Sequence, residues 1–229
     1  MNRSTAFALL GALAVAALMI GAQAQARSAA TLTIATHQNE ISQGNQNMGW
    51  WDDAATHVVG NDNYEVGNAP DEGTRIFRNF FSFDTSLAGG NCASAATLQI
   101  PIGEGSGDFG GVQGVANYVF HDVSTPASTL ITAGGPDLTV YHDLGTGTVY
   151  GGRVLPTVGP YPVGNFPVSL NAAGLAALNA AIKAPHPGYF TVGGMIKGEP
   201  ADTSLFGFTP ENHSGQEWPV RLVLTLGSC

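Results

Sequence analysis

Basic side chains are scarce in this chain, and charge of either sign is low. The 229 residues include 8 Lys and Arg against 17 Asp and Glu, a formal net charge of −9, and only 11% of residues are charged. Average soluble domains contain about 25% charged residues. Nucleic acids and anionic lipid surfaces are bound through clusters of Lys and Arg. We therefore expect neither kind of partner.

Long apolar runs are also few, and the clearest one lies at the start of the chain. Arg3 precedes an uncharged apolar run over 6–20, and two overlapping Ala-x-Ala sites follow within 22–26. This pattern predicts a signal peptide over 1–26. A membrane helix is the alternative, but the run is shorter than the roughly 20 apolar residues of a bilayer span. We expect a single domain over 27–229 that is secreted or periplasmic and not inserted in a membrane after cleavage.

Cysteine is limited to two residues, Cys92 and Cys229. An exported chain meets an oxidising compartment in which a disulfide persists. The favoured prediction is an internal bond that ties the C-terminal strand to the middle of the chain. The alternative is that Cys229 links two chains, and the expected assembly state is a monomer or a weak oligomer.

Strand patterns dominate the rest of the sequence. Short β-branched and aromatic runs alternate with period two between Gly, Pro, Asn and Asp clusters. The predicted strands cover 31–36, 75–83, 96–102, 118–123, 139–141, 149–155, 166–170, 189–192, 205–208 and 220–226. The run over 75–83 has aromatics on both faces, which is typical of a central strand. About ten short strands without a βαβ rhythm predict an all-β, two-sheet antiparallel sandwich of jelly-roll type, with a barrel as the alternative.

One helix is expected, near 171–183. Asn171 is a suitable N-cap, and Leu175, Leu178 and Ile182 follow as a narrow apolar stripe. Pro185 then ends the run. Such a helix would close one end of the sandwich or connect two strands.

Residues for catalysis do not form a recognisable set. The six His residues lack the spacing of a zinc site or of a catalytic motif, and no Gly-x-Ser-x-Gly elbow occurs. We therefore predict no catalytic residue. A hydrolase or lyase acting on polysaccharide would instead show two carboxylates facing each other across an aromatic-lined cleft.

An acidic segment over 52–72 suggests a structural Ca²⁺ ion. Carboxylate oxygens are the ligands that Ca²⁺ prefers, and the candidates are Asp52, Asp53, Asp62 and Asp71. The spacing of an EF-hand loop is absent. The alternative is a set of turns, because Asn and Asp bond to their own backbone there. If the ion binds, added Ca²⁺ raises the melting temperature relative to EDTA.

Exposed aromatic rings are the last candidates, because the C–H face of a sugar packs on them. Trp50, Tyr64 and Trp218 are the predicted ligand-binding residues, and Trp50 lies among Asn, Gln and Asp residues. Trp51 is adjacent and would face the other side of an extended segment, so at most one of the pair is expected as a platform. The alternative for each ring is packing in the core.

Several runs together resemble a group of secreted bacterial β-sandwich proteins that are often found with a PEP-CTERM sorting tail. The matching segments are 78–84, 95–98, 121–126, 143–151 and 170–179. The resemblance implies an exported jelly-roll-like domain with a distant architectural likeness to carbohydrate-binding modules, and it implies no catalytic residue. The sequence lacks the tail, so we do not expect sorting by that route.

These observations favour a secreted, non-catalytic protein that binds extracellular polysaccharide or contributes to a surface matrix. A purely structural or adhesive extracellular protein is the second hypothesis, and a polysaccharide hydrolase or lyase is the third. Fold alone does not decide among them.

Overall fold

The computed structural model describes residues 29–44, 46–60, 63–69, 73, 75–102, 116–155, 164–185, 188–201, 203–208, 219–227 and 229. The predicted signal peptide lies outside these residues. About half of the described chain is strand, and the strand pairs among these residues all run antiparallel.

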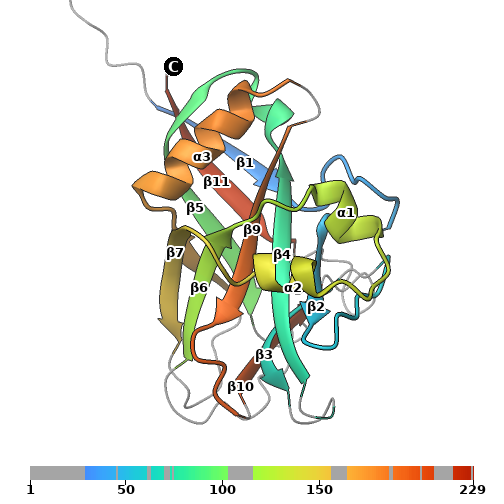
Figure 1. The fold of residues 1–229 in the computed structure, drawn as a ribbon. Helices are drawn as coiled ribbons and strands as arrows, with labels where there is room; N and C mark the ends of the chain where they lie inside the picture. Colours follow the sequence, from blue (N-terminus) through green and yellow to red (C-terminus); the bar gives the residue numbers. More distant parts are fainter. Residues whose placement is uncertain are drawn as a thin grey trace, which may run out of the picture.

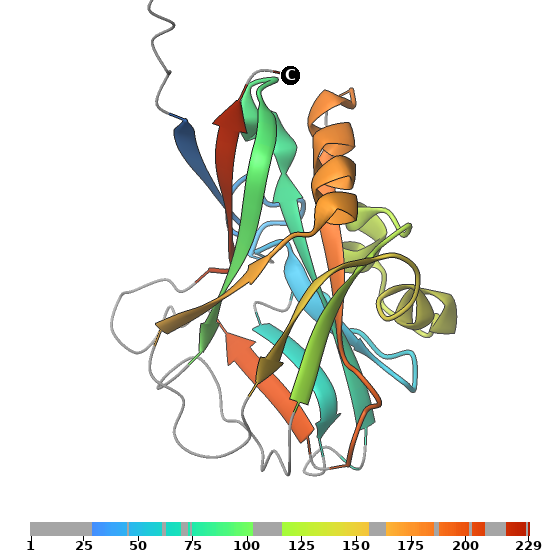
Figure 2. The same ribbon diagram turned by 90° about the vertical axis from the view of Figure 1, so that its left-hand side faces the viewer.

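Two antiparallel sheets pack face to face (Figures 1 and 2). The smaller sheet has the order β1 (Ala30–Ala35), β11 (Arg221–Gly227), β5 (Cys92–Ile102), β8 (Gly164–Ser169). The larger sheet has the order β10 (Thr203–Phe208), β3 (Asn63–Ala69), β4 (Arg75–Asp84), β9 (Tyr189–Ile196), β6 (Ala116–Asp122), β7 (Val149–Leu155), and β2 (Met48–Asp52) also pairs with β4. This arrangement confirms the predicted two-sheet β-sandwich.

The main hydrophobic core fills the space between the sheets. Leu98 of β5 and Leu222 of β11 contribute from the smaller sheet, and Phe81 of β4 and Phe120 of β6 contribute from the larger one. All four side chains are fully buried. The alternation that predicted these strands therefore marks their inward faces, as expected for a sandwich.

The helix α3 (Ala172–Lys183) confirms the helix predicted near 171–183. Asn171 caps it, because its side-chain oxygen accepts a hydrogen bond from Gly174 N at 3.0 Å. Leu178 and Ile182 are buried in the main core. The helix contacts β5 of one sheet and β9 of the other, so it covers one end of the sandwich (Figure 2).

The strand predicted over 139–141 is wrong, because these residues belong to the helix α2 (Leu138–Asp143). Asp137 caps this helix by accepting a hydrogen bond from Thr139 N at 2.9 Å. Val140, Tyr141 and the following Leu144 are all buried against one cluster. A three-residue window is too short to distinguish such a helical face from strand alternation.

Two further helical segments and two strands also lie where the sequence did not indicate them. The helical segments are α1 (Ala127–Thr132) and the 3-10 turn η2 (Thr85–Ala88). The unpredicted strands are β2 and β3, which lie in or beside the segment that was expected to form loops. Both pair with β4. Ladder hydrogen bonds to a central strand outweigh the weak strand preference of Gly, Asn and Asp.

A second hydrophobic cluster covers the outer face of the larger sheet. Trp51 of β2 and Phe80 of β4 pack there against Leu130 and Ile131 of α1 and against Tyr141 of α2. Figure 1 shows both helices lying over this sheet. The strand β4 is consequently buried on both faces, which confirms its prediction as a central strand.

The outer cluster depends on a close approach between β9 and the segment that follows α2. Gly193 of β9 lies so near Leu144 that an added Cβ atom would stand 2.7 Å from Leu144 Cα and closer still to its carbonyl oxygen. A side chain at this position would therefore lift the α2 segment from the sheet.

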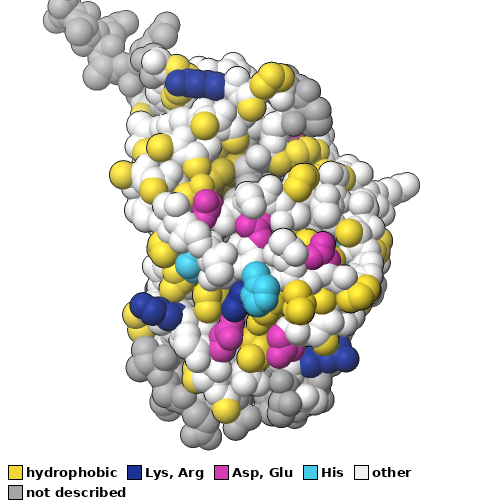
Figure 3. Space-filling model, viewed as in Figure 1, with side chains coloured by type: hydrophobic (Ala, Val, Ile, Leu, Met, Phe, Trp, Pro, Cys, Tyr) yellow, Lys and Arg dark blue, Asp and Glu magenta, His cyan; other side chains and the backbone are white. Residues whose placement is uncertain are grey.

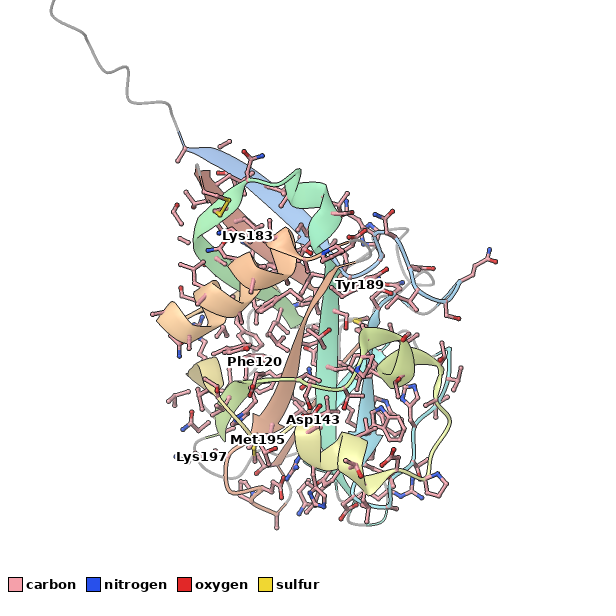
Figure 4. All side chains as sticks on the ribbon, turned by 45° about the horizontal axis from the view of Figure 1, so that its top comes forward. Phe120, Asp143, Lys183, Tyr189, Met195 and Lys197 are labelled. Carbon is pink, nitrogen blue, oxygen red and sulfur yellow. A yellow bond between two sulfur atoms is a disulfide. The ribbon has the colours of Figure 1, made fainter. Side chains whose placement is uncertain are left out.

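The disulfide prediction is confirmed in its internal form. Cys92, the first residue of β5, is bonded to Cys229 of the same chain across 137 positions (Figure 4). Disulfides persist in oxidising compartments, so the bond indicates an extracytoplasmic setting. Among the described residues, no helix has the length and hydropathy needed to cross a bilayer.

Candidate functional site

Two of the three predicted ligand-binding aromatics, Trp50 and Tyr64, lie in the described part of the chain, and neither is a fully exposed ring. Tyr64 is only 1% exposed, and its hydroxyl donates to the carbonyl of Pro101 at 2.9 Å, so it is a core residue. Trp50 is partly buried, and its Nε1 donates to Asn63 Oδ1 at 2.9 Å. Trp218 lies outside the described residues.

Two of the four predicted calcium ligands, Asp52 and Asp53, lie in the described part of the chain, and both are already engaged by protein groups. The fully buried Asp52 carboxylate pairs with Arg75 Nη1 at 2.9 Å and accepts from Thr56 N at 2.7 Å. Asp53 Oδ1 accepts from Ile76 N at 3.2 Å. Asp62 and Asp71 lie outside the described residues. In the described part of the chain, no group of three or more His, Cys, Asp or Glu side chains has the arrangement of a metal site.

A better candidate is an open hollow of about 560 Å³ on the outer face of the larger sheet. We call it the Tyr189 hollow. Its lining residues are Glu40, Ile41, Pro126, Ala127, Ser128 and Tyr189. Small-ligand sites are usually concave, apolar in the main, and about 300–1,000 Å³ in volume, with a few polar groups placed to orient the ligand. The hollow fits that description.

A polar strip on β4 and β9 adjoins the hollow. Ser82 Oγ and Thr191 Oγ1 lie 2.8 Å apart, and Asp84 Oδ2 accepts from Asn39 Nδ2 at 2.6 Å. The Tyr189 hydroxyl donates to the carbonyl of Asn39 at 3.3 Å. Because side chains alternate along a strand, this strip faces away from the main core, into which the intervening residues of both strands point.

Glu40 and Ile41 form one wall of the hollow, and the side chain of Asn47 holds this segment in place. This side chain is fully buried, its Oδ1 accepts from Ile41 N at 2.8 Å, and its Nδ2 donates to the carbonyls of Gln38 and Asn39 at 3.3 Å each. The wall is therefore organised before any ligand arrives, which reduces the entropy cost of binding.

We expect Asn47→Ala to lower the free energy of unfolding by about 2–4 kcal/mol, from three lost hydrogen bonds of about 1 kcal/mol each and a strained backbone. Asn47 has φ 48°, a left-handed conformation that Asn tolerates better than Ala. Urea unfolding measures the loss. Asn91→Ala is the matched control, because Asn91 donates to only one carbonyl, that of Ala88 at 3.0 Å. An equal loss in both variants would contradict this role of Asn47.

The opposite wall is fixed by Asp143, the last residue of α2. Its carboxylate accepts from the backbone N and the hydroxyl of Ser124, at 3.0 and 2.8 Å, and from the same two groups of Thr125, at 2.7 Å each. These residues directly precede Pro126, Ala127 and Ser128 of the lining. Asp143 thus acts as a positioning residue for this wall.

His57 connects β2 to α1 beneath the same wall. Its ring stacks on Trp51 with centroids 4.9 Å apart, Nδ1 lies 2.8 Å from the carbonyl of Trp50, and Nε2 lies 3.3 Å from that of Ile131. Burial lowers the pKa of His57 below 6.5, although both carbonyls act in the opposite direction. The pKa of His121 is also lowered, mainly by burial.

Because His57 and His121 have lowered pKa values, we expect the protein to lose stability in mild acid. Because their pKa values are lower in the folded than in the unfolded chain, the unfolded chain binds more protons below pH 6.5. Their contribution to stability is therefore complete above pH 6.5 and is lost as the pH falls from there through the folded-state pKa. Urea midpoints from about pH 7.5 to about pH 5 measure the slope. His57→Phe should reduce the slope of the urea midpoint against pH. An unchanged slope would contradict the contribution of His57 to the pH dependence.

The electrostatic character of the Tyr189 hollow is acidic. Of the lining residues that the structure describes, Glu40 is the one that carries a charge, and none is Lys or Arg. Burial, and to a smaller extent the nearby Asp84 carboxylate, raise the pKa of the Tyr189 hydroxyl. The hydroxyl thus stays neutral, and the ring is partly exposed at the edge of the hollow. Figure 4 labels Tyr189 at the start of β9.

A second hollow of about 370 Å³ is lined by Asp53, Ala54, Ala55, Pro136, Asp137 and Leu138. It is smaller and more open, and none of its described lining residues is aromatic. The Tyr189 hollow is therefore the stronger candidate.

Sequence reasoning missed this site because its parts are distant in the chain. Residues 40–41, 126–128 and 189 come together only when β4 and β9 pair and α1 packs on the sheet. Tyr189 was predicted only as the first residue of a strand, and no local motif distinguished it.

Comparison of the chain with protein-family models and with curated proteins found no match in either. The resemblance to the PEP-CTERM-associated group remains a prediction.

Proposed function

We propose that this protein is a secreted or periplasmic β-sandwich that binds extracellular glycan without catalysis, and that the sugar occupies the Tyr189 hollow. The observation that carries the proposal is the combination in one hollow of a partly exposed aromatic ring with a carboxylate and a hydroxyl, from Tyr189, Glu40 and Ser128. Sugar rings present apolar C–H faces and hydroxyl edges, and this set offers a partner to each.

The carboxylates support binding over hydrolysis. Most glycoside hydrolases use two carboxyl groups that flank the scissile bond, and the described lining residues include one carboxylate, that of Glu40. One of its oxygens accepts a hydrogen bond from Gly44 N at 2.8 Å. A carboxylate held in this way is suited to accept hydrogen bonds from sugar hydroxyls.

The test is a glycan array followed by calorimetric titration, with protein produced in the periplasm so that the disulfide forms. We expect a glycan that binds the wild type to bind Tyr189→Ala about tenfold more weakly, which equals about 1.4 kcal/mol. Tyr189→Phe keeps the ring and should bind nearly as well as the wild type.

Trp50→Ala tests where the glycan binds, because the sequence predicts Trp50 as a ligand-binding residue and Trp50 lies outside the lining of the hollow. It should leave affinity unchanged. Silence across the array would overturn the proposal and favour a structural role, and turnover of a polysaccharide would favour an enzyme. Loss of binding in Trp50→Ala alone would move the site away from the hollow.

A further inference from the structure

The charges around the Tyr189 hollow bear on which sugars it can accept. Glu40 contributes a carboxylate to the lining, and Asp84 contributes a second one to the adjoining polar strip. Figure 3 shows carboxylates gathered over the middle of this face, while most Lys and Arg side chains lie towards its margins. Glu40 therefore gives the described lining of the hollow a negative formal charge.

Two basic side chains of the central strand β4 are already engaged. Arg78 forms an ion pair with Glu199 at 2.7 Å, and its guanidinium lies 4.2 Å from the centre of the Tyr141 ring. Arg75 pairs with Asp52 at 2.9 Å. Neither is a lining residue of the hollow, so neither offers a counter-charge to an acidic ligand there.

We infer that the hollow selects neutral and amino sugars and rejects sugars that carry carboxylate or sulfate groups; this inference rests on the proposed function. An acid group would approach Glu40, and none of the described lining residues is a Lys or Arg that could offset the repulsion. Like charges at an interface strongly disfavour a partner. The ammonium group of an amino sugar would instead pair with Glu40. The ring of Tyr189 belongs to the same lining, and aromatic rings attract cations at their faces.

The experiment compares four oligosaccharides of equal length: a chitosan, a chitin, a cello-oligosaccharide and a polygalacturonate oligomer. We expect the chitosan to bind at least as tightly as the two neutral oligomers. The polygalacturonate should bind at least about fivefold more weakly than they do, the ratio that corresponds to about 1 kcal/mol at a partly exposed charge.

Glu40→Gln assigns the selectivity to one group. It should weaken the chitosan about three- to fivefold relative to the cello-oligosaccharide, the range of an exposed charge pair. Gln retains an oxygen that can accept from Gly44 N. Asp137→Asn is the matched control, since it removes the same charge at the N-cap of α2, outside the hollow, and Asn caps helices as well as Asp does.

The outcomes separate the two proposals. If neutral and acidic oligomers bind equally, or the acidic one more tightly, the charge selectivity is overturned and glycan binding stands. If Glu40→Gln and Asp137→Asn change the chitosan preference equally, the role of Glu40 is overturned. If no oligosaccharide binds, the proposed function itself fails.

Discussion

Replacing Cys92 and Cys229 together by Ser should lower the free energy of unfolding by about 2–5 kcal/mol, the usual cost of removing a native disulfide from a secreted domain. The bond closes a loop of 137 positions, and long loops constrain the unfolded chain most. It also holds the end of β11, which lies between β1 and β5 in the smaller sheet. Fraying of this strand would expose Leu222 and Leu224, both fully buried.

Urea unfolding under oxidising and reducing conditions measures this effect. The double variant should be insensitive to reductant, and the reduced wild type should resemble it. A reduced wild type as stable as the oxidised protein would contradict the structural importance of the bond. A dimer that reductant separates would show that Cys229 also links chains.

Trp51→Ala should lower the free energy of unfolding by about 3–5 kcal/mol, the range for truncating a large buried aromatic side chain. Trp51 is fully buried, stacks on His57, and donates from Nε1 to the carbonyl of Leu130 in α1 at 3.4 Å. Its removal leaves a cavity beneath α1 and withdraws support from the wall that contains Ala127 and Ser128. We therefore expect loss of stability and weaker glycan binding together.

Trp50→Ala is the matched control for this effect, because the two residues are adjacent in β2 and face opposite sides. Trp50 is partly exposed and packs edge-on against Phe77 with ring centroids 5.0 Å apart. Trp50→Ala should lower the free energy of unfolding clearly less than Trp51→Ala does. Hydrogen exchange of the α1 amides should accelerate only in Trp51→Ala. Equal losses of stability would contradict the assignment of Trp51 to a second core.

Much of the fold could be predicted because period-two alternation is a local signal. The pattern over 220–226 and 96–102 located β11 and β5, and the Asn171 cap with its apolar stripe located α3. The strands β2 and β3 were missed because their strand state comes from pairing with β4, which is a tertiary effect. For the same reason, Asp52 appeared as a calcium ligand although Arg75 neutralises it in the fold.

The candidate site was much less accessible to sequence reasoning. Exposure of an aromatic ring depends on which face of its strand is covered, and this depends on elements that are distant in the chain. Tyr64 faces Phe81 in the core, with ring centroids 5.2 Å apart, whereas Tyr189 lies on the outer face of its sheet beside the polar strip. Both residues occur in strands, and their local sequences do not distinguish the two environments.

Glycan binding in the Tyr189 hollow is tested most directly by an NMR titration of the isotope-labelled protein with the neutral oligosaccharide that binds best. We expect chemical-shift changes concentrated at Glu40, Ser128 and Tyr189, with the indole signal of Trp50 unchanged. Changes centred on Trp50 and Asn63 would contradict the location of the site, and the absence of any saturable change would contradict glycan recognition altogether.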